Sequence, residues 1–171
     1  MKNKLLKDSN EIQDSIKKIA AKINEAYAGK KIDLIALNAA PKFLIEDLME
    51  ELEIEIRLQS LVFEDYDQLN QSGEVHLSKD LDFPIYDRHV LLADGMIISG
   101  NTHFYICNYL KQRLPKSLSL VCVGSKPKFL AKELPHCYSL FNFHNEWVEG
   151  YGIGGEEFSK EKYLVDLKKT L

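Results

Sequence analysis

HVLLADGMIISGNT, residues 89–102, is the stretch that decides the fold of this chain. Its first half is an apolar run bounded by turn residues, which is typical of a parallel strand covered on both faces. We predict a strand over residues 89–94 that ends at the acid Asp94, followed by a short loop. Small residues then open a predicted helix over residues 100–113. A strand that leads through a short loop into a helix indicates an α/β fold.

The turn Ser99-Gly100-Asn101-Thr102 predicts an anion site. It brings backbone N–H groups, two hydroxyls and a helix N-terminus to one place, an arrangement that suits a phosphate group. Gly100 would let the backbone turn and approach the ligand closely. The alternative is that these residues only cap the helix and close a tight turn.

The remaining chain alternates predicted helices and strands, which favours a mainly parallel sheet. Helices are expected over residues 9–27, capped by Ser9, and over residues 41–52, begun by Pro41. Strands are expected at residues 32–37, 54–63, 74–78, 118–123, 138–143 and 163–167, with a loop at 64–73. In the strand over residues 54–63, alternation puts most apolar side chains, Leu58 among them, on one face. Right-handed crossovers would bring the loops after residues 37, 94 and 123 to one sheet edge.

Five further segments carry a family pattern. They are SGEV at 72–75, KDL at 79–81, PKSL at 115–118, SKP at 125–127 and EWVEGYG at 146–152. In this order, and together with residues 89–102, they resemble the hypoxanthine/guanine enzymes of the type I phosphoribosyltransferases. The resemblance implies that family's fold, a mainly parallel sheet flanked by helices with a small hood. It also implies one domain over residues 1–171, with a core at about 9–123 and the hood at about 124–171.

The resemblance implies a glycosyltransferase of purine salvage. Such an enzyme transfers ribose 5-phosphate from phosphoribosyl pyrophosphate to hypoxanthine or guanine, giving IMP or GMP and pyrophosphate. The turn at residues 99–102 would hold the 5-phosphate, and Asp94 would accept hydrogen bonds from the ribose hydroxyls. Alternatively, Asp94 is only a solvated carboxylate at a strand end.

Three residues match the base-binding positions of the family. Lys126 would donate to the exocyclic oxygen of a 6-oxopurine, Trp147 would stack on the base, and the backbone of Val148 would read the base edge. A lysine suits an oxygen that only accepts, whereas adenine presents an amine there. Alternatively, Lys126 is a surface lysine in a turn, and Trp147 belongs to a hydrophobic patch.

Several positions depart from the family pattern. Ile98 stands where these enzymes have an aspartate that handles a purine proton, so no catalytic residue is assigned. Gly95 replaces one carboxylate of an acidic pair, and Gly154 replaces a metal-binding aspartate. The cofactor that the resemblance implies is Mg²⁺, yet no metal ligand is assigned. The segment DGMIISG at 94–100 is also similar to DPMLATG of uracil phosphoribosyltransferases, which have no acid at the position of Ile98.

The pyrophosphate region is altered as well. Asn38 and Ala39 replace a Lys-Gly turn that contacts pyrophosphate in the family, and Lys160 would stand in for an arginine. We therefore carry two hypotheses. The first is an active purine phosphoribosyltransferase, and the second is a catalytically impaired paralogue that binds a nucleotide or phosphoribosyl ligand as a regulator.

Bulk properties restrict the partners. The net charge of −4, with basic residues spread along the chain, gives no general attraction to nucleic acid or membranes. We expect no secretory or membrane-spanning segment. Because the three cysteines lack metal-ligand spacing, we also expect them to be reduced thiols in the cytoplasm. The resemblance implies phosphoribosyl pyrophosphate and a purine base or nucleotide as ligands, and a homodimer or homotetramer.

Overall fold

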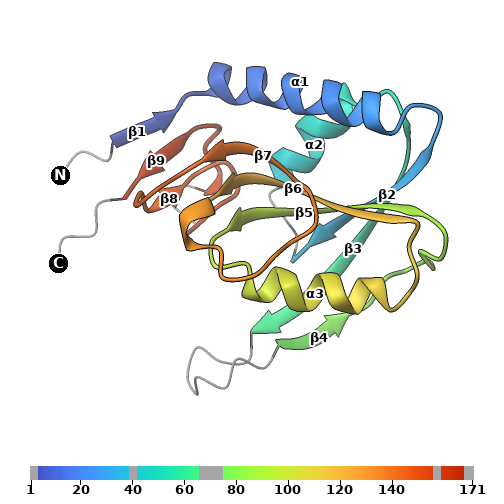
Figure 1. Ribbon diagram of the computed structural model, residues 1–171. Coiled ribbons are helices and arrows are strands. Elements are labelled where there is room, and N and C mark those ends of the chain that lie inside the picture. The colour runs from blue at the N-terminus through green and yellow to red at the C-terminus, as the bar shows by residue number, and fades with distance from the viewer. Residues whose placement is uncertain (1–3, 39–41, 66–74, 156–158, 168–171) are drawn as a thin grey trace.

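A six-stranded sheet forms the centre of the computed structural model, which describes residues 4–38, 42–65, 75–155 and 159–167 (Figure 1). Across the sheet, the strands are β4 (Val75–Lys79), β3 (Glu55–Asp65), β2 (Lys31–Leu37), β5 (His89–Ile97), β6 (Ser117–Ser125) and β7 (Cys137–Asn142). Strands β3, β2, β5, β6 and β7 run parallel, and β4 pairs antiparallel with β3. The predicted α/β class with a mainly parallel sheet is confirmed.

Helices cover both faces of this sheet. They are α1 (Ser9–Ala26) and α2 (Lys42–Glu51) on one face and α3 (Asn101–Lys111) on the other (Figure 1). Along β5, Leu91 and Ala93 pack in the cluster under α1 and α2, while Val90 and Leu92 pack in the cluster under α3. A central parallel strand therefore needs apolar side chains on both faces, which explains the unbroken apolar run in the sequence.

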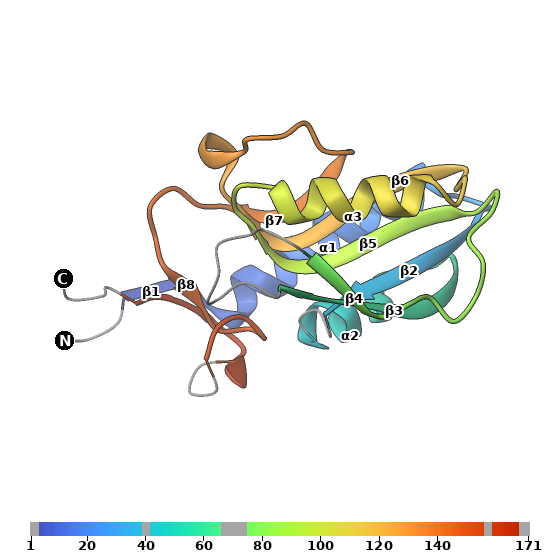
Figure 2. The same ribbon diagram turned by 90° about the horizontal axis from the view of Figure 1, so that it is seen from below.

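A small sheet, which we call the hood, lies beside the carboxyl ends of the central strands. It consists of β1 (Lys4–Lys7), β9 (Leu164–Asp166) and β8 (Val148–Glu149), joined antiparallel in that order. Both ends of the described chain therefore meet in the hood, as Figure 2 also shows. The expected boundary near residue 124 does not separate the two sheets. Strand β7 follows residue 124 but belongs to the large sheet, and β1 precedes it but belongs to the hood.

A buried hydrogen-bond network ties the segment after β8 to the helices. The Tyr151 hydroxyl donates to Asp47 Oδ2 at 2.5 Å, and Gln13 Nε2 donates to the same oxygen at 2.5 Å. Burial and the nearby Asp47 carboxylate raise the pKa of Tyr151, so its hydroxyl stays a donor. This network fixes the turn at residues 150–154, which becomes one wall of the candidate site.

A fully buried carboxylate lies in β2, away from the hood. Asp33 has no exposed surface and is held by two arginines. Arg57 Nε and Nη2 lie 2.8 and 2.7 Å from its two oxygens, and Arg88 Nε and Nη2 lie 3.0 and 2.9 Å from them. Four charge-assisted hydrogen bonds thus satisfy the carboxylate, and they join β2, β3 and the start of β5.

The central strand is longer than predicted. It runs through Ile97 because it keeps pairing with β6 as far as Ser125, so Asp94 lies inside the strand and no loop follows it. Helix α1 also begins differently: Asp8 caps it in place of Ser9. The Asp8 side chain accepts the Glu11 N–H at 2.9 Å, and Glu11 accepts the Asp8 N–H at 3.1 Å, forming a reciprocal capping box.

Strand β3 is buried on one face only, and the face on which alternation put most apolar side chains is the less buried one. Leu61 and Phe63 pack under α3, whereas Leu58, on the opposite face, is 47% exposed. On that face, Ile54 and Ile56, near the start of the strand, are half-buried against the cluster under α1 and α2. Of the predicted loop at residues 64–73, residues 64 and 65 belong to β3, because they pair with β4. The rest of this predicted loop lies outside the described residues. Within the described residues, no helix combines the length and apolarity that crossing a membrane requires.

Candidate functional site

The candidate site lies where β5 and β6 end, at the edge of the sheet that faces the hood. Parallel strands bring their carboxyl ends to one edge, and ligands of open α/β sheets bind outside it. The segments that follow β5 and β6 are tied together there. Lys126 N–H donates to the carbonyl of Ile97 at 2.9 Å, and Ala131 N–H donates to the carbonyl of Ser99 at 2.9 Å.

The turn after β5 has the geometry of an open helix N-terminus. Gly100 is the residue that precedes α3, with φ 74°, and it offers no side-chain cap. Ser99 Oγ accepts the N–H of Asn101 at 3.4 Å, which is a long contact. The N–H groups of Thr102 and His103, which also lie in the first turn of α3, have no carbonyl partner within the helix and are open to an anion.

Position 100 requires a glycine, both because of its backbone conformation and because of the side chains that lie next to it. Its positive φ is one that other L residues adopt rarely. A Cβ there would also lie 3.1 Å from Leu134 and 3.2 Å from Leu130. The backbone of the turn is therefore packed closely against the segment that follows Lys126.

Asp94 is held in place by a histidine that the sequence did not single out. His103 Nε2 lies 2.7 Å from Asp94 Oδ2, and the N–H of Gly95 donates to Oδ1 at 2.7 Å. Because a carboxylate only accepts, Nε2 carries the proton in this contact. His103 is buried in the first turn of α3, so the pair braces the strand end against the helix that opens at the turn. Asp94 keeps a quarter of its side chain exposed.

A cavity of about 220 Å³ brings the predicted base-binding residues together. It is lined by Met96, Ile98, Lys126, Trp147, Val148, Glu149, Ile153 and Gly154. These residues come from the end of β5, the turn after β6, and β8 with the turn after it. Most of the lining is apolar, and Lys126 and Glu149 are its charged groups among the described residues.

The structure describes only two of the three residues predicted for the pyrophosphate region. Asn38 directly follows β2 and has φ 51°; its N–H donates to the carbonyl of Leu61 and its Oδ1 accepts the N–H of Phe63 at 2.7 Å. Its side chain is thus used to hold β3. Ala39 lies outside the described residues. Lys160 is exposed in the turn before β9 and does not belong to the described lining of the cavity.

The described residues do not fit a magnesium ion held by protein carboxylates. No group of three or more His, Cys, Asp or Glu side chains within this part of the chain could hold a metal ion. A side chain at Gly154 would be strained by the φ of 88°, and its Cβ would displace the flexible side chain of Glu149, whose Cγ would lie 2.5 Å away. Around this part of the chain, the oxygen ligands of a Mg²⁺ ion would come mainly from a bound substrate.

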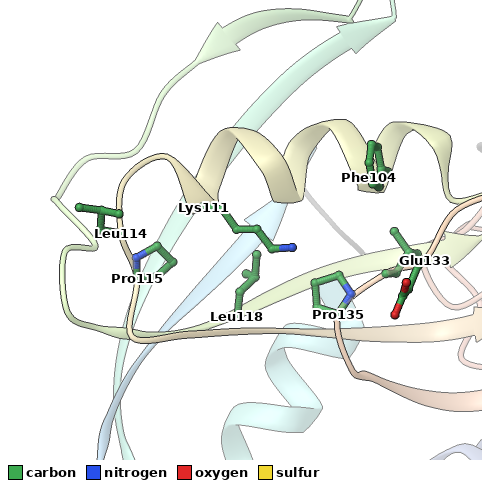
Figure 3. A pocket seen from close by; sticks show the side chains of 8 residues that line it. Phe104, Lys111, Leu114, Pro115, Leu118, Glu133 and Pro135 are labelled. Atoms are coloured by element: carbon green, nitrogen blue, oxygen red, sulfur yellow. The ribbon is translucent and has the colours of Figure 1, made fainter.

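A second, larger hollow lies apart from this site. It measures about 690 Å³ and runs between α3 and the segment before β7. Figure 3 shows Lys111, Leu118 and Pro135 around it. It shares no lining residue with the cavity at Trp147.

Fold and site together define a class. A parallel sheet covered on both faces, with an open helix N-terminus and a mainly apolar cavity at one edge, is the framework of a nucleotide-binding α/β protein. The sequence matches the phosphoribosyl transferase domain family over residues 3–154. The chain belongs to the phosphoribosyltransferase family.

Individual relatives cover nearly the whole chain. A hypoxanthine phosphoribosyltransferase of Buchnera aphidicola is 30% identical over 171 residues, which cover 98% of this chain and 96% of the relative. A hypoxanthine-guanine-xanthine phosphoribosyltransferase of Tritrichomonas foetus is 29% identical over 155 residues, 88% of this chain and 82% of the relative. The crystal structure of a hypoxanthine-guanine phosphoribosyltransferase of Bacillus anthracis has the same fold, with a TM-score of 0.88 at 23% identity, covering 97% and 99% of the two chains.

Two residues of the site were missed by sequence reasoning. His103 lies nine positions beyond Asp94, and nothing local connects a strand acid to the first turn of the next helix. Glu149 had a visible signal: it stands two residues after Trp147 in an extended segment, so the two side chains share a face.

Proposed function

We propose that this protein is a purine phosphoribosyltransferase that transfers ribose 5-phosphate from phosphoribosyl pyrophosphate to a 6-oxopurine, giving IMP or GMP and pyrophosphate. One observation carries the proposal: the phosphate turn and the base cavity are parts of one edge. Ile98 lines the cavity and is followed directly by Ser99 of the turn. A nucleotide that places its base in the cavity therefore has its phosphate end directed to the turn.

The turn at residues 99–102 is assigned the 5-phosphate. Its N–H groups belong to the first turn of α3, where the helix dipole favours negative charge. Ser99 and Thr102 add hydroxyl donors. The close packing of Gly100 against Leu130 and Leu134 keeps the turn in one shape, which lowers the entropy that binding would otherwise cost.

The cavity is assigned the base. Trp147 is half exposed and offers an indole face for stacking, and Lys126 offers donors to a carbonyl oxygen. Val148 contributes backbone groups next to both. The base is thereby placed by one stacking contact and one charged hydrogen bond.

Asp94 is assigned the ribose. Positive charge builds on the ribose ring as the bond from C1 to pyrophosphate breaks. Asp94, braced by His103 and by the N–H of Gly95, presents a fixed negative charge at this edge. Because Ile98 cannot accept a proton, we attribute the rate to positioning and electrostatics and assign no general base.

The remaining parts of the assignment follow the family. Pyrophosphate would lie near the segment after Asn38, with Lys160 as a candidate cation. We expect a homodimer or homotetramer in the cytoplasm. Mg²⁺ would enter as a complex with phosphoribosyl pyrophosphate, because the described residues offer no carboxylate cluster for it.

A second function is a nucleotide-binding regulator without turnover. The observation that favours it is the loss of carboxylates at Gly95, Ile98 and Gly154, which catalysis would use and phosphate binding does not need. The two functions make opposite predictions for turnover and the same prediction for binding.

The test is a panel of bases with phosphoribosyl pyrophosphate and magnesium, scored for pyrophosphate release. We expect release with guanine and hypoxanthine, and none above the base-free control with adenine or uracil. GMP binding is measured on the same sample by calorimetry. If GMP binds but no base releases pyrophosphate, the transferase proposal is wrong and the regulator is the function.

A further inference from the structure

Glu149 is a charged residue of the cavity to which the family resemblance gives no role. It lies in β8, and its Oε1 is 3.3 Å from the indole Nε1 of Trp147. Its Oε2 is 3.4 Å from the N–H of Gly155. Its carboxylate therefore lies at the N–H edge of the indole whose face is assigned to the base.

The carboxylate takes the space that a side chain at Gly154 would need. A Cβ on Gly154 would lie 2.5 Å from Cγ, 2.6 Å from Cδ and 2.8 Å from Oε2 of Glu149. The φ of Gly154 is 88°, which also disfavours any other residue. Gly154 thus leaves space for the Glu149 side chain in the position that it takes here.

Lys126 and Glu149 line the same small cavity without neutralising each other. Within the described residues, the ion pairs closer than 4.0 Å do not include one between these two side chains. The cavity therefore holds a donor and an acceptor separated by space, surrounded by apolar groups such as Met96 and Ile153. Such a pair of opposite groups recognises a ring with an acceptor next to donors.

We propose that Glu149 reads the purine edge beyond the 6-oxo group and makes the site selective for guanine. This inference rests on the proposed function, which places the base in this cavity. With O6 of guanine toward Lys126, the N1–H and 2-amino groups follow on the same edge and can donate to a carboxylate. Hypoxanthine offers N1–H alone. Xanthine presents a carbonyl oxygen at position 2, which a carboxylate repels.

The experiment uses the only tryptophan of the chain, Trp147, as its own reporter. Its fluorescence is titrated with GMP, IMP and XMP at fixed ionic strength. Losing one charged hydrogen bond costs about tenfold in affinity, so GMP should bind about 10-fold tighter than IMP. XMP should bind more weakly still, since its oxygen places a second acceptor against the carboxylate.

The variant is Glu149→Gln, with Glu146→Gln as the matched control. The glutamine would keep the shape and offer an amide that can donate to the xanthine oxygen, so the GMP and XMP affinities should come within about threefold of each other. Glu146 lies in the same segment, but its carboxylate accepts the N–H of His144 and does not line the cavity. Glu146→Gln should keep the full preference. Thermal unfolding of each variant checks that it is folded.

The outcomes separate this inference from the proposed function. Equal GMP and XMP affinities in the unmodified protein, or a preference that Glu149→Gln leaves intact, overturn the role of Glu149 while purine binding stands. No binding of any purine nucleotide overturns the proposed function itself. A fluorescence change caused by Mg²⁺ alone and lost in Glu149→Gln would make Glu149 a metal ligand and contradict its role in reading the base.

Discussion

Replacing Lys126 by methionine is expected to remove most of the preference of this protein for 6-oxopurine over adenine nucleotides, leaving only the part that Glu149 contributes. Lys126 has donors and no acceptor, so it matches a carbonyl oxygen and opposes the amine of adenine. The contact with a charged donor is worth about 10- to 100-fold in affinity. Methionine keeps the apolar stem, so stacking on Trp147 should survive and hold both nucleotides weakly, with GMP still about 10-fold tighter than AMP because Glu149 accepts from the guanine edge.

Lys128→Met is the control for this prediction. Lys128 lies two residues further, in the short 3-10 helix Pro127–Phe129 that directly follows Lys126; it is exposed and does not line the cavity. It should leave both affinities unchanged, as measured by calorimetry with GMP and AMP. Equal binding of GMP and AMP by the unmodified protein would refute the role given to Lys126.

The largest effect on stability is expected from Asp33→Ala. This substitution leaves the guanidinium groups of Arg57 and Arg88 facing each other without their shared carboxylate, and it opens a polar cavity in β2. Breaking such a buried pair costs about 3–5 kcal/mol of unfolding free energy. The value should fall at the lower end, because the two arginines keep 31% and 26% of their side chains exposed.

Urea unfolding of Asp33→Ala measures this loss. Asp82→Ala is the matched control, since Asp82 forms an exposed pair with Lys79 and should change the unfolding free energy by less than about 1 kcal/mol. Asp33 lies near the start of β2, away from the strand ends that carry the site, so nucleotide selectivity should persist. Equal losses for the two variants would mean that the buried cluster contributes no more than a surface pair.

The central sheet could be predicted from the sequence because its innermost strands carry apolar runs. Strands β5 and β6 contain such runs, β2 and β7 are mainly apolar, and all four were expected close to their observed places. Strands β1 and β8 could not be found this way. They are short, and they exist because they pair with β9 in the hood, a contact between distant parts of the chain.

The site was predictable where the family pattern covers it. Lys126, Trp147 and Ile98 belong to three separated segments, and the family pattern alone placed them together; the cavity now contains all of them. The contact between Asp94 and His103, and the closeness of the Glu149 side chain to Gly154, are set by the three-dimensional arrangement of the chain. Sequence spacing carries no direct signal for either, so the structure was needed to find them.

The most direct test of this account is a crystal structure of the protein with bound GMP. The 5-phosphate should lie on the N–H groups of residues 99–102, and the guanine should stack on Trp147 with O6 toward Lys126 and its 2-amino group toward Glu149. A nucleotide bound in the hollow beside α3, or a phosphate bound away from the turn while the turn stays empty, would contradict the account.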